Sequence, residues 1–534
     1  MQAPTTSEPA IEAHTTRIKK EDILIFFACI TPSFIVGVYG LNRPYDAIPD
    51  QDMLWASEAL RLLRGVAPSY ADHPGAFWTL AYKANIIMLQ GIFNFQVVDP
   101  SGNILPEGLE SLIRVARIEN AILSGLCAAL TYPLALLLST KKPFAAASSL
   151  IISLSSAILV SVSEIRNEAI SVFLLLLFIL CASYSAKKRI TGAIGLALGL
   201  AGLFLFFAAA LAKQQVLLTA PLAFIAVFAA LRTNNRDNYE AKLGSLIAAR
   251  PKRIAGLLIT ASAPWLIAAH PDIDLINLPA WTAINIGLAL CLSINFKHFD
   301  SKLPLLKPLL IVGLFEVVLF KLLIPGWWRQ AVTGFPSWMF RHADPTNDHT
   351  GHTLSGINTY LSELFTPHLL AAAALTGVLL ISIAQAARER DPGDKIQTAY
   401  RISTPIAWLL TMAILVASSQ RVASRYEIYF FMPIVILSAA TTGHQTSGNA
   451  DNINTKPSLI TKALTSIILI TALIASVANA TELRIFVNRG QPESFKCFSH
   501  HMDRTMQLTS ASKCKVFNQA ILEKDQYDSW AGPR

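Results

Sequence analysis

Two aspartates follow the first hydrophobic segment of the chain. Asp50 and Asp52 precede a stretch with helical spacing, and Asp72 and His73 come shortly after that stretch. Carboxylates at this place can accept a proton, hold a divalent metal ion or couple ion movement at a membrane surface. A protein that only had to reside in lipid would have little use for them, so this region is the first candidate for a functional site.

Three further polar turns between hydrophobic segments mix cations, carboxylates and amides. They contain Glu164, Arg166, Asn167, Glu168, Lys213, Gln214, Gln215, Arg421, Arg425, Tyr426 and Glu427. The planar fork of arginine and the point charge of lysine can both neutralise a lipid phosphate at the membrane surface. A nearby carboxylate can take a proton from an attacking hydroxyl group or hold a metal ion on the phosphate. Together these residues predict a site for a phosphate-bearing lipid.

The composition is typical of helical membrane proteins. Of the 534 residues, 53% are hydrophobic and 15% are charged, whereas soluble proteins have about 25% charged residues. The mean hydropathy is +0.46. Apolar runs of roughly 17–22 residues recur, and each is long enough to cross a bilayer as a helix. The net charge of +9 lies in short loops rather than in a basic stripe with exposed aromatics, which argues against nucleic acid as a partner.

The expected architecture is an all-α membrane protein with about thirteen transmembrane helices. These helices are expected over residues 22–40, 118–139, 144–163, 169–186, 191–212, 215–232, 254–270, 277–295, 307–325, 367–387, 402–418, 428–442 and 459–480. Basic clusters precede the first helix and recur in alternate loops, so the positive-inside rule predicts a cytoplasmic N-terminus. All the polar segments described above then reach the extracytoplasmic side together.

This threading divides the chain into a membrane domain with two large outer loops and a tail at each end. The parts are a cytoplasmic tail (1–21), the transmembrane domain (22–480), its outer loops (42–117 and 326–368) and an extracytoplasmic tail (481–534). Within the first loop, residues 53–63 and 76–95 are apolar but interrupted by charged and polar side chains. This pattern predicts helices that lie at the membrane interface rather than across the membrane.

The order of these motifs resembles that of the GT-C superfamily of polytopic glycosyltransferases, especially the protein O-mannosyltransferase and lipid A aminoarabinose transferase branch. The matching elements are Asp50-Gln51-Asp52, Leu62-Leu63-Arg64-Gly65, Asp72-His73-Pro74-Gly75, Ile165-Arg166-Asn167-Glu168, Lys213-Gln214-Gln215, and Arg425-Tyr426 with Pro433. The resemblance covers the chain to about residue 440. Asp-Gln-Asp stands where the family has an Asp-Glu pair, and Gly75 replaces a second proline. The first departure leaves open which aspartate corresponds to the family's base.

The resemblance implies an inverting glycosyltransferase that moves a hexosyl or pentosyl unit from a polyprenyl-phosphate donor to an extracytoplasmic lipid, glycan or protein of the cell envelope. It places such an enzyme in a bacterial inner membrane. The implied catalytic residues are Asp50 or Asp52 as base or metal ligand, with Glu168 as a second acid. The implied phosphate contacts are Arg166, Lys213 and Arg425. Asp72, His73, Gln214 and Tyr426 would support them, and a divalent cation on Asp50, Asp52 and His73 is compatible with this set.

Each candidate also has a purely structural interpretation. Asp50 and Asp52 can cap an interfacial helix, because aspartate is a favoured N-cap residue. Lys213 can extend from a helix end to the lipid headgroups, and Arg425 can anchor there. Cys497 and Cys514 are the two cysteines of the C-terminal tail, and an extracytoplasmic tail favours a disulfide between them over two free thiols.

Glu316 favours a different function. A carboxylate inside a predicted membrane helix is typical of secondary transporters or lipid-linked sugar flippases. Lys321 is five residues away, a poor spacing for pairing along one helix. The other polar residues gather on one side of the membrane rather than at its midplane, which favours the enzyme. A non-catalytic assembly or glycan-binding protein is the third alternative, and it predicts that the acidic loop tolerates substitution.

Overall fold

The computed structural model describes mainly helices between residues 19 and 319. The described residues are 19–41, 55, 59, 62–63, 76–92, 94, 96, 106–137, 142–154, 158–159, 162, 165–188, 190–220, 223–224, 226–227, 251–269, 277–296, 305–319, 466, 470 and 474. Within these residues the regular elements are all helical. The long elements are α1 (Lys20–Leu41), α3 (Ala76–Gly91), α4 (Pro106–Leu137), α5 (Lys142–Ser153), α7 (Asn167–Lys188), α8 (Gly192–Ala212), η2 (Gln214–Thr219), α11 (Pro251–Ala269), α12 (Asn277–Ser293) and α13 (Leu306–Val318).

Four of these helices are long and apolar enough to cross a membrane. They are Lys20–Leu41, Ser111–Leu137, Asn167–Lys188 and Gly192–Ala212. By length and composition, the chain is therefore a multi-pass helical membrane protein. The number of about thirteen spans and their orientation stay predictions.

Most described helices lie where the sequence predicts them, but α4 begins earlier than expected and α5 (Lys142–Ser153) ends earlier than the expected residue 163. The bounds of α1, α7, α8, α11 and α12 agree with the expected ranges to within three residues. Helix α4 instead begins at Pro106, inside the expected outer loop, because Leu112, Ile113 and Ala116 continue its buried face. The expected helix at 215–232 begins as the short 3-10 helix η2, after a single extended residue, Lys213.

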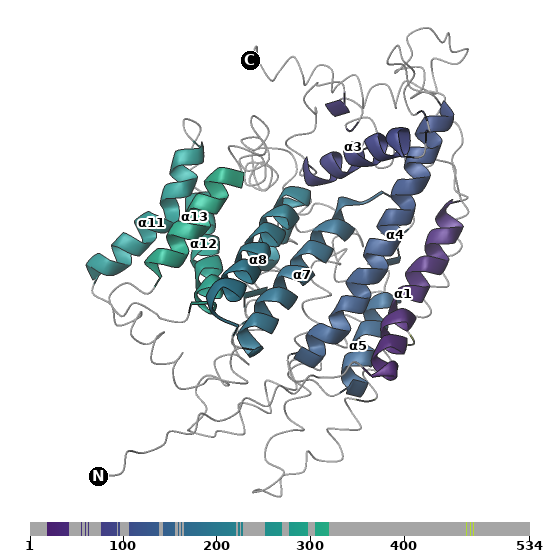
Figure 1. Cartoon of the computed structure of the whole chain (residues 1–534). Helices are drawn as coiled ribbons and strands as arrows, with labels where there is room; N and C mark the ends of the chain where they lie inside the picture. Colours follow the sequence, from purple (N-terminus) through teal and green to yellow (C-terminus); the bar gives the residue numbers. More distant parts are fainter. Residues whose placement is uncertain are drawn as a thin grey trace, which may run out of the picture.

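The helices form a row that continues into a group of three (Figure 1). Helix α1 packs on α4, α4 packs on α7, and α7 packs on α8. Helix α5 packs against both α1 and α4. Helices α11, α12 and α13 pack on one another and meet the row at α8. Stacked rings join the two parts, because Phe207 of α8 lies 6.1 Å from Phe315 of α13 between ring centroids.

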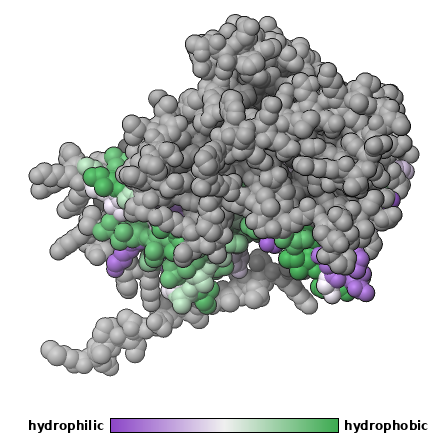
Figure 2. All heavy atoms as spheres, turned by 90° about the horizontal axis from the view of Figure 1, so that it is seen from above, coloured by the Kyte–Doolittle hydropathy of each residue, from purple (hydrophilic) through white to green (hydrophobic). Residues whose placement is uncertain are grey.

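Apolar side chains cover much of the outer surface of these helices. Helix α1 exposes Leu24, Phe27 and Phe34, and α13 exposes Leu310 and Leu314. The coloured surface in Figure 2 is accordingly mostly hydrophobic. Such exposure is unfavourable in water and favourable against lipid acyl chains, as the membrane assignment requires.

A stripe of small residues brings α1 close to α4. Cys29, Ser33, Gly37 and Gly40 are the buried residues of α1, and their spacing of three or four places them on one helix face. A Cβ atom added at Gly37 would lie 2.6 Å from the Cβ atom of Ala121 in α4. Small residues of this kind let membrane helices approach closely and pack their backbones.

The change Gly37→Ala is expected to destabilise the protein by about 1–3 kcal/mol, because the helices must separate to admit the methyl group. Gly256→Ala in α11 is the matched control, since nothing lies within 4 Å of the added carbon there. Thermal unfolding of both variants in the same detergent tests this expectation. Equal stabilities would contradict the close approach of α1 and α4.

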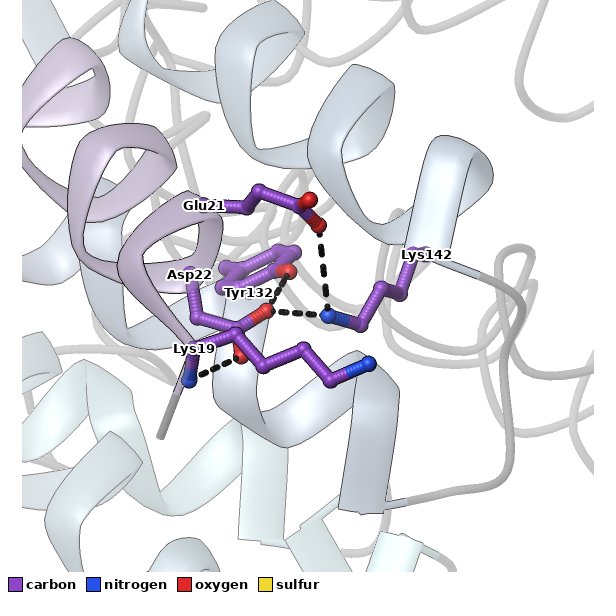
Figure 3. Close-up of polar contacts among 5 residues, drawn as sticks. All are labelled: Lys19, Glu21, Asp22, Tyr132 and Lys142. Carbon is purple, nitrogen blue, oxygen red and sulfur yellow. Dashed lines mark hydrogen bonds and ion pairs between the residues drawn. The ribbon is translucent and has the colours of Figure 1, made fainter. Parts of the chain in front are cut away.

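A polar cluster fixes one end of the row (Figure 3). Asp22 of α1 accepts hydrogen bonds from Tyr132 of α4 at 2.8 Å and from Lys142 of α5 at 2.7 Å. At the same end, Lys187 of α7 donates to the carbonyl oxygen of Leu137 at 2.8 Å. The start of α7 and the end of α8 therefore lie at the opposite end, which we name the Glu168 end.

Candidate functional site

The structure brings three of the expected site residues together at the Glu168 end. Arg166 directly precedes α7, Glu168 lies in the first turn of α7, and Lys213 directly follows α8. Because α7 and α8 are antiparallel neighbours, the start of one lies beside the end of the other. The other expected members lie outside the described residues: Asp50, Asp52, Asp72, His73, Arg425, Tyr426, Cys497 and Cys514. Gln214 begins η2, directly after Lys213.

Local backbone structure fixes Lys213 and Glu168 in place. Lys213 is extended (φ −158°, ψ 114°) between two helices, its N–H donates to Ala209 at 2.9 Å, and its carbonyl oxygen accepts from Val216 at 3.1 Å. Glu168 lies in the first turn of α7, where the free N–H groups of a helix favour a negative charge. Both charged side chains thus extend from rigid helix ends rather than from long loops.

The two side chains form a buried ion pair. Lys213 Nζ lies 3.3 Å from Glu168 Oε1, and the side chains are 9% and 2% exposed. Charges this deeply buried lose most of their hydration, so each needs an opposite charge or hydrogen bonds nearby. Among the described residues, Glu168 Oε2 has no hydrogen-bond partner. The carboxylate therefore holds Lys213 and keeps one oxygen free of a described partner.

The described cluster brings two cations close to one carboxylate. Arg166 is 6% exposed, and its guanidinium acts electrostatically on Glu168 together with Lys213. Arginine and lysine are the residues that proteins usually use to bind phosphate and carboxylate groups, so these two cations suit an anionic ligand.

Helix α3 lies over this end of the row (Figure 1). Its position at Ala76–Gly91 confirms the helix that the sequence predicts over 76–95. It packs against both α8 and α4, and Asn85 of α3 donates to Glu119 of α4 at 2.6 Å. Trp78 and Tyr82 are buried on α3 with their rings edge to face. Helix α3 thus packs against the helices at the end of the row where Glu168 and Lys213 form their ion pair.

Sequence reasoning missed the polar residues on the buried face of α4. Arg117 is 1% exposed and donates from Nη1 to the carbonyl oxygen of Gly40, the last-turn residue of α1, at 3.2 Å. Asn120 and Ser124 are also buried. Asn120 and Ser124 follow Arg117 by three and seven residues, so all three lie on one helix face. This helical spacing is the sequence feature from which the polar face could have been predicted.

The metal prediction is not tested by these residues. Across the described segments, no three His, Cys, Asp or Glu side chains are close enough to hold a metal ion. The expected ligands Asp50, Asp52 and His73 lie outside those segments, so a divalent cation stays a prediction.

Comparison with known proteins gives distant structural matches. No protein-family model matches the chain, and no curated protein matches it. The archaeal oligosaccharyltransferase AglB from Archaeoglobus fulgidus, solved with an inhibitory peptide and a dolichol-phosphate, matches with 12% identity and a TM-score of 0.43, over 92% of this chain and 61% of that chain. The apo form of the Archaeoglobus fulgidus oligosaccharyltransferase matches with 13% identity and a TM-score of 0.42, over 92% and 60% of the two chains. This chain covers less than two thirds of either protein, and similarity at this level does not identify a family.

Proposed function

We propose that this protein is a membrane glycosyltransferase that moves a sugar from a polyprenyl-phosphate donor to an acceptor on the extracytoplasmic side of a bacterial inner membrane. The observation that supports it is the buried cluster of Arg166, Glu168 and Lys213 at the ends of two membrane-spanning helices. Its arginine and lysine side chains suit the phosphate group of a lipid whose chain lies in the bilayer. The acceptor is a lipid, glycan or protein of the envelope.

Arg166 and Lys213 are the phosphate-binding residues in this proposal. In the structure Lys213 pairs with Glu168, which holds the ammonium group in place before the donor arrives. A phosphate that enters the cluster brings negative charge to both cations, and Arg425 would add a third. The same charges stabilise the leaving group, because the polyprenyl phosphate gains negative charge when the sugar–oxygen bond breaks.

Asp50 or Asp52 takes the proton of the acceptor in this proposal. The acceptor oxygen or nitrogen attacks the anomeric carbon on the face opposite the phosphate, so that the new bond forms as the old one breaks and the configuration inverts. Glu168 Oε2 is a second carboxylate oxygen near the phosphate site. It gives the site a further proton acceptor, while Oε1 of the same carboxylate orients Lys213.

The first experiment is a turnover assay with the full chain in liposomes. A panel of polyprenyl-phosphate sugars is offered with a crude envelope acceptor, and released polyprenyl phosphate is measured. Release with one donor, dependent on the acceptor, is the expected result. Vesicles with the donor but no acceptor are the control for hydrolysis.

A different outcome would move the assignment to a transporter or a lipid-linked sugar flippase. In that case no donor would release its phosphate, while a solute or a labelled lipid crossed the sealed vesicle membrane. Measuring both signals on the same vesicles separates the two functions.

A further inference from the structure

A buried carboxyl group lies among α11, α12 and α13. Glu316 of α13 is 0% exposed, and Asn285 of α12 is 1% exposed. The amide nitrogen of Asn285 donates to Glu316 Oε2 at 3.0 Å and to the carbonyl oxygen of Ala261 in α11 at 2.9 Å. One amide group therefore joins three helices.

Two oxygen atoms of this bridge remain unsatisfied. Within the described segments, Glu316 Oε1 and Asn285 Oδ1 are buried without a hydrogen-bond partner. Both N–H bonds of the Asn285 amide are used by Ala261 and Glu316. The Glu316 carboxyl group thus accepts a hydrogen bond on Oε2. If the group were ionised, Oε1 would have no hydrogen-bond donor among the described residues.

The bridge lies near the middle of α11 and α12 and close to the end of α13. Ala261 is ten residues from the start of α11, and Glu316 is ten residues from the start of α13. Water and mobile counterions are scarce around a side chain that is 0% exposed, so an uncompensated charge is strongly disfavoured there.

The surrounding helices offer no counter-charge at this level. Helix α13 packs against α8, α11 and α12, and α8 and α12 contain no acidic or basic residue. The other titratable or charged residues of the four helices are Lys252, Arg253, Cys291 and Lys307, and the three cations lie in the first turns of α11 and α13. Lys321 lies outside the described residues.

We propose that Glu316 and Asn285 form a proton-binding site in which Glu316 is held as a neutral carboxylic acid at neutral pH. The Asn285 amide donates to Oε2, which acts as the carbonyl oxygen of the acid, and the proton resides on Oε1. A neutral acid removes the uncompensated charge and keeps the bridge between the three helices. Phe315, beside Glu316, stacks on Phe207 of α8, so this site adjoins the helix that ends at Lys213.

The proposal is tested by labelling the full chain in native membranes with dicyclohexylcarbodiimide. A protonated carboxyl group adds across a C=N bond of this reagent, the proton moves to nitrogen, and the acyl group then migrates to give a stable N-acylurea. The adduct contains the whole reagent, so no leaving group or oxidant is needed. Mass spectrometry of peptides locates it.

Labelling of Glu316 at pH 7, decreasing as the pH is raised, is the expected result. Glu168 is the internal control, because it is equally buried but paired with Lys213 and is expected to stay unlabelled. Absence of label on Glu316 at pH 7 would overturn the proposal. Label that appears only in acid and is suppressed by Na⁺ would also overturn it, since the carboxylate would then be ionised and hold a metal cation.

Stability provides the second measurement. Glu316→Gln keeps an uncharged acceptor for the Asn285 amide, so the Tm is expected to stay unchanged and its pH dependence above neutrality is expected to decrease. A large loss of Tm in Glu316→Gln would show that the negative charge is required, for example to pair with Lys321, and would overturn the proposal. Asn285→Leu, which removes the amide donor, is expected to lower the Tm.

Discussion

Lys213→Met is expected to destabilise the protein by about 3–5 kcal/mol, because the change removes the cation in contact with the buried Glu168 and leaves Arg166 as its remaining described counter-charge. The side chains of the pair are 9% and 2% exposed, so water cannot replace the lost ammonium group. The same variant is expected to lose about 10²–10³-fold in kcat, as when one stabilising group at a developing negative charge is removed. Thermal unfolding and donor turnover measure the two effects.

A double variant separates folding from function. Lys213→Met combined with Glu168→Gln replaces both charges by uncharged groups of similar size, so most of the lost stability is expected to return. Transfer is not expected to return, since the phosphate contact is still absent. Lys213→Arg is the conservative control, which keeps the positive charge and is expected to retain part of the activity. A stable double variant with normal transfer would show that the pair serves only the fold.

The helices around this pair could be predicted because their signals are local. Helices α7 and α8 are long apolar runs with charged or extended residues at their ends, and antiparallel neighbours must bring such ends together. The juxtaposition of Arg166, Glu168 and Lys213 follows from that topology. The contact of Lys213 with Glu168 depends on side-chain packing and could not be predicted from the spacing of the residues.

Other features depend on contacts between distant segments. Arg117 resembles a loop residue in the sequence, yet it lies inside α4 and binds the last turn of α1. The link from Asn85 to Glu119 requires α3 to dock on α4, which no periodicity encodes. Glu316 was recognised as a buried charge, but its partner is Asn285 on another helix.

Asp50→Asn combined with Asp52→Asn is expected to abolish most transfer, with kcat reduced by about 10²–10⁴-fold, the usual contribution of a general base. Asparagine is nearly the same size as aspartate but cannot accept the acceptor's proton. Donor binding is expected to persist, because the phosphate contacts at Arg166 and Lys213 remain intact. Single-turnover rates and equilibrium donor binding are measured on the same preparation.

The single variants identify the base, since only one of the two aspartates is expected to reproduce the loss seen in the double variant. Asp237→Asn is the matched control, because this aspartate lies in a loop predicted to face the cytoplasm and should leave transfer unchanged. Retained donor binding and an unchanged Tm distinguish a missing base from a misfolded loop. Full transfer by the double variant would exclude both aspartates, and the proton would then have to go to another carboxylate, with Glu168 Oε2 the next group to replace.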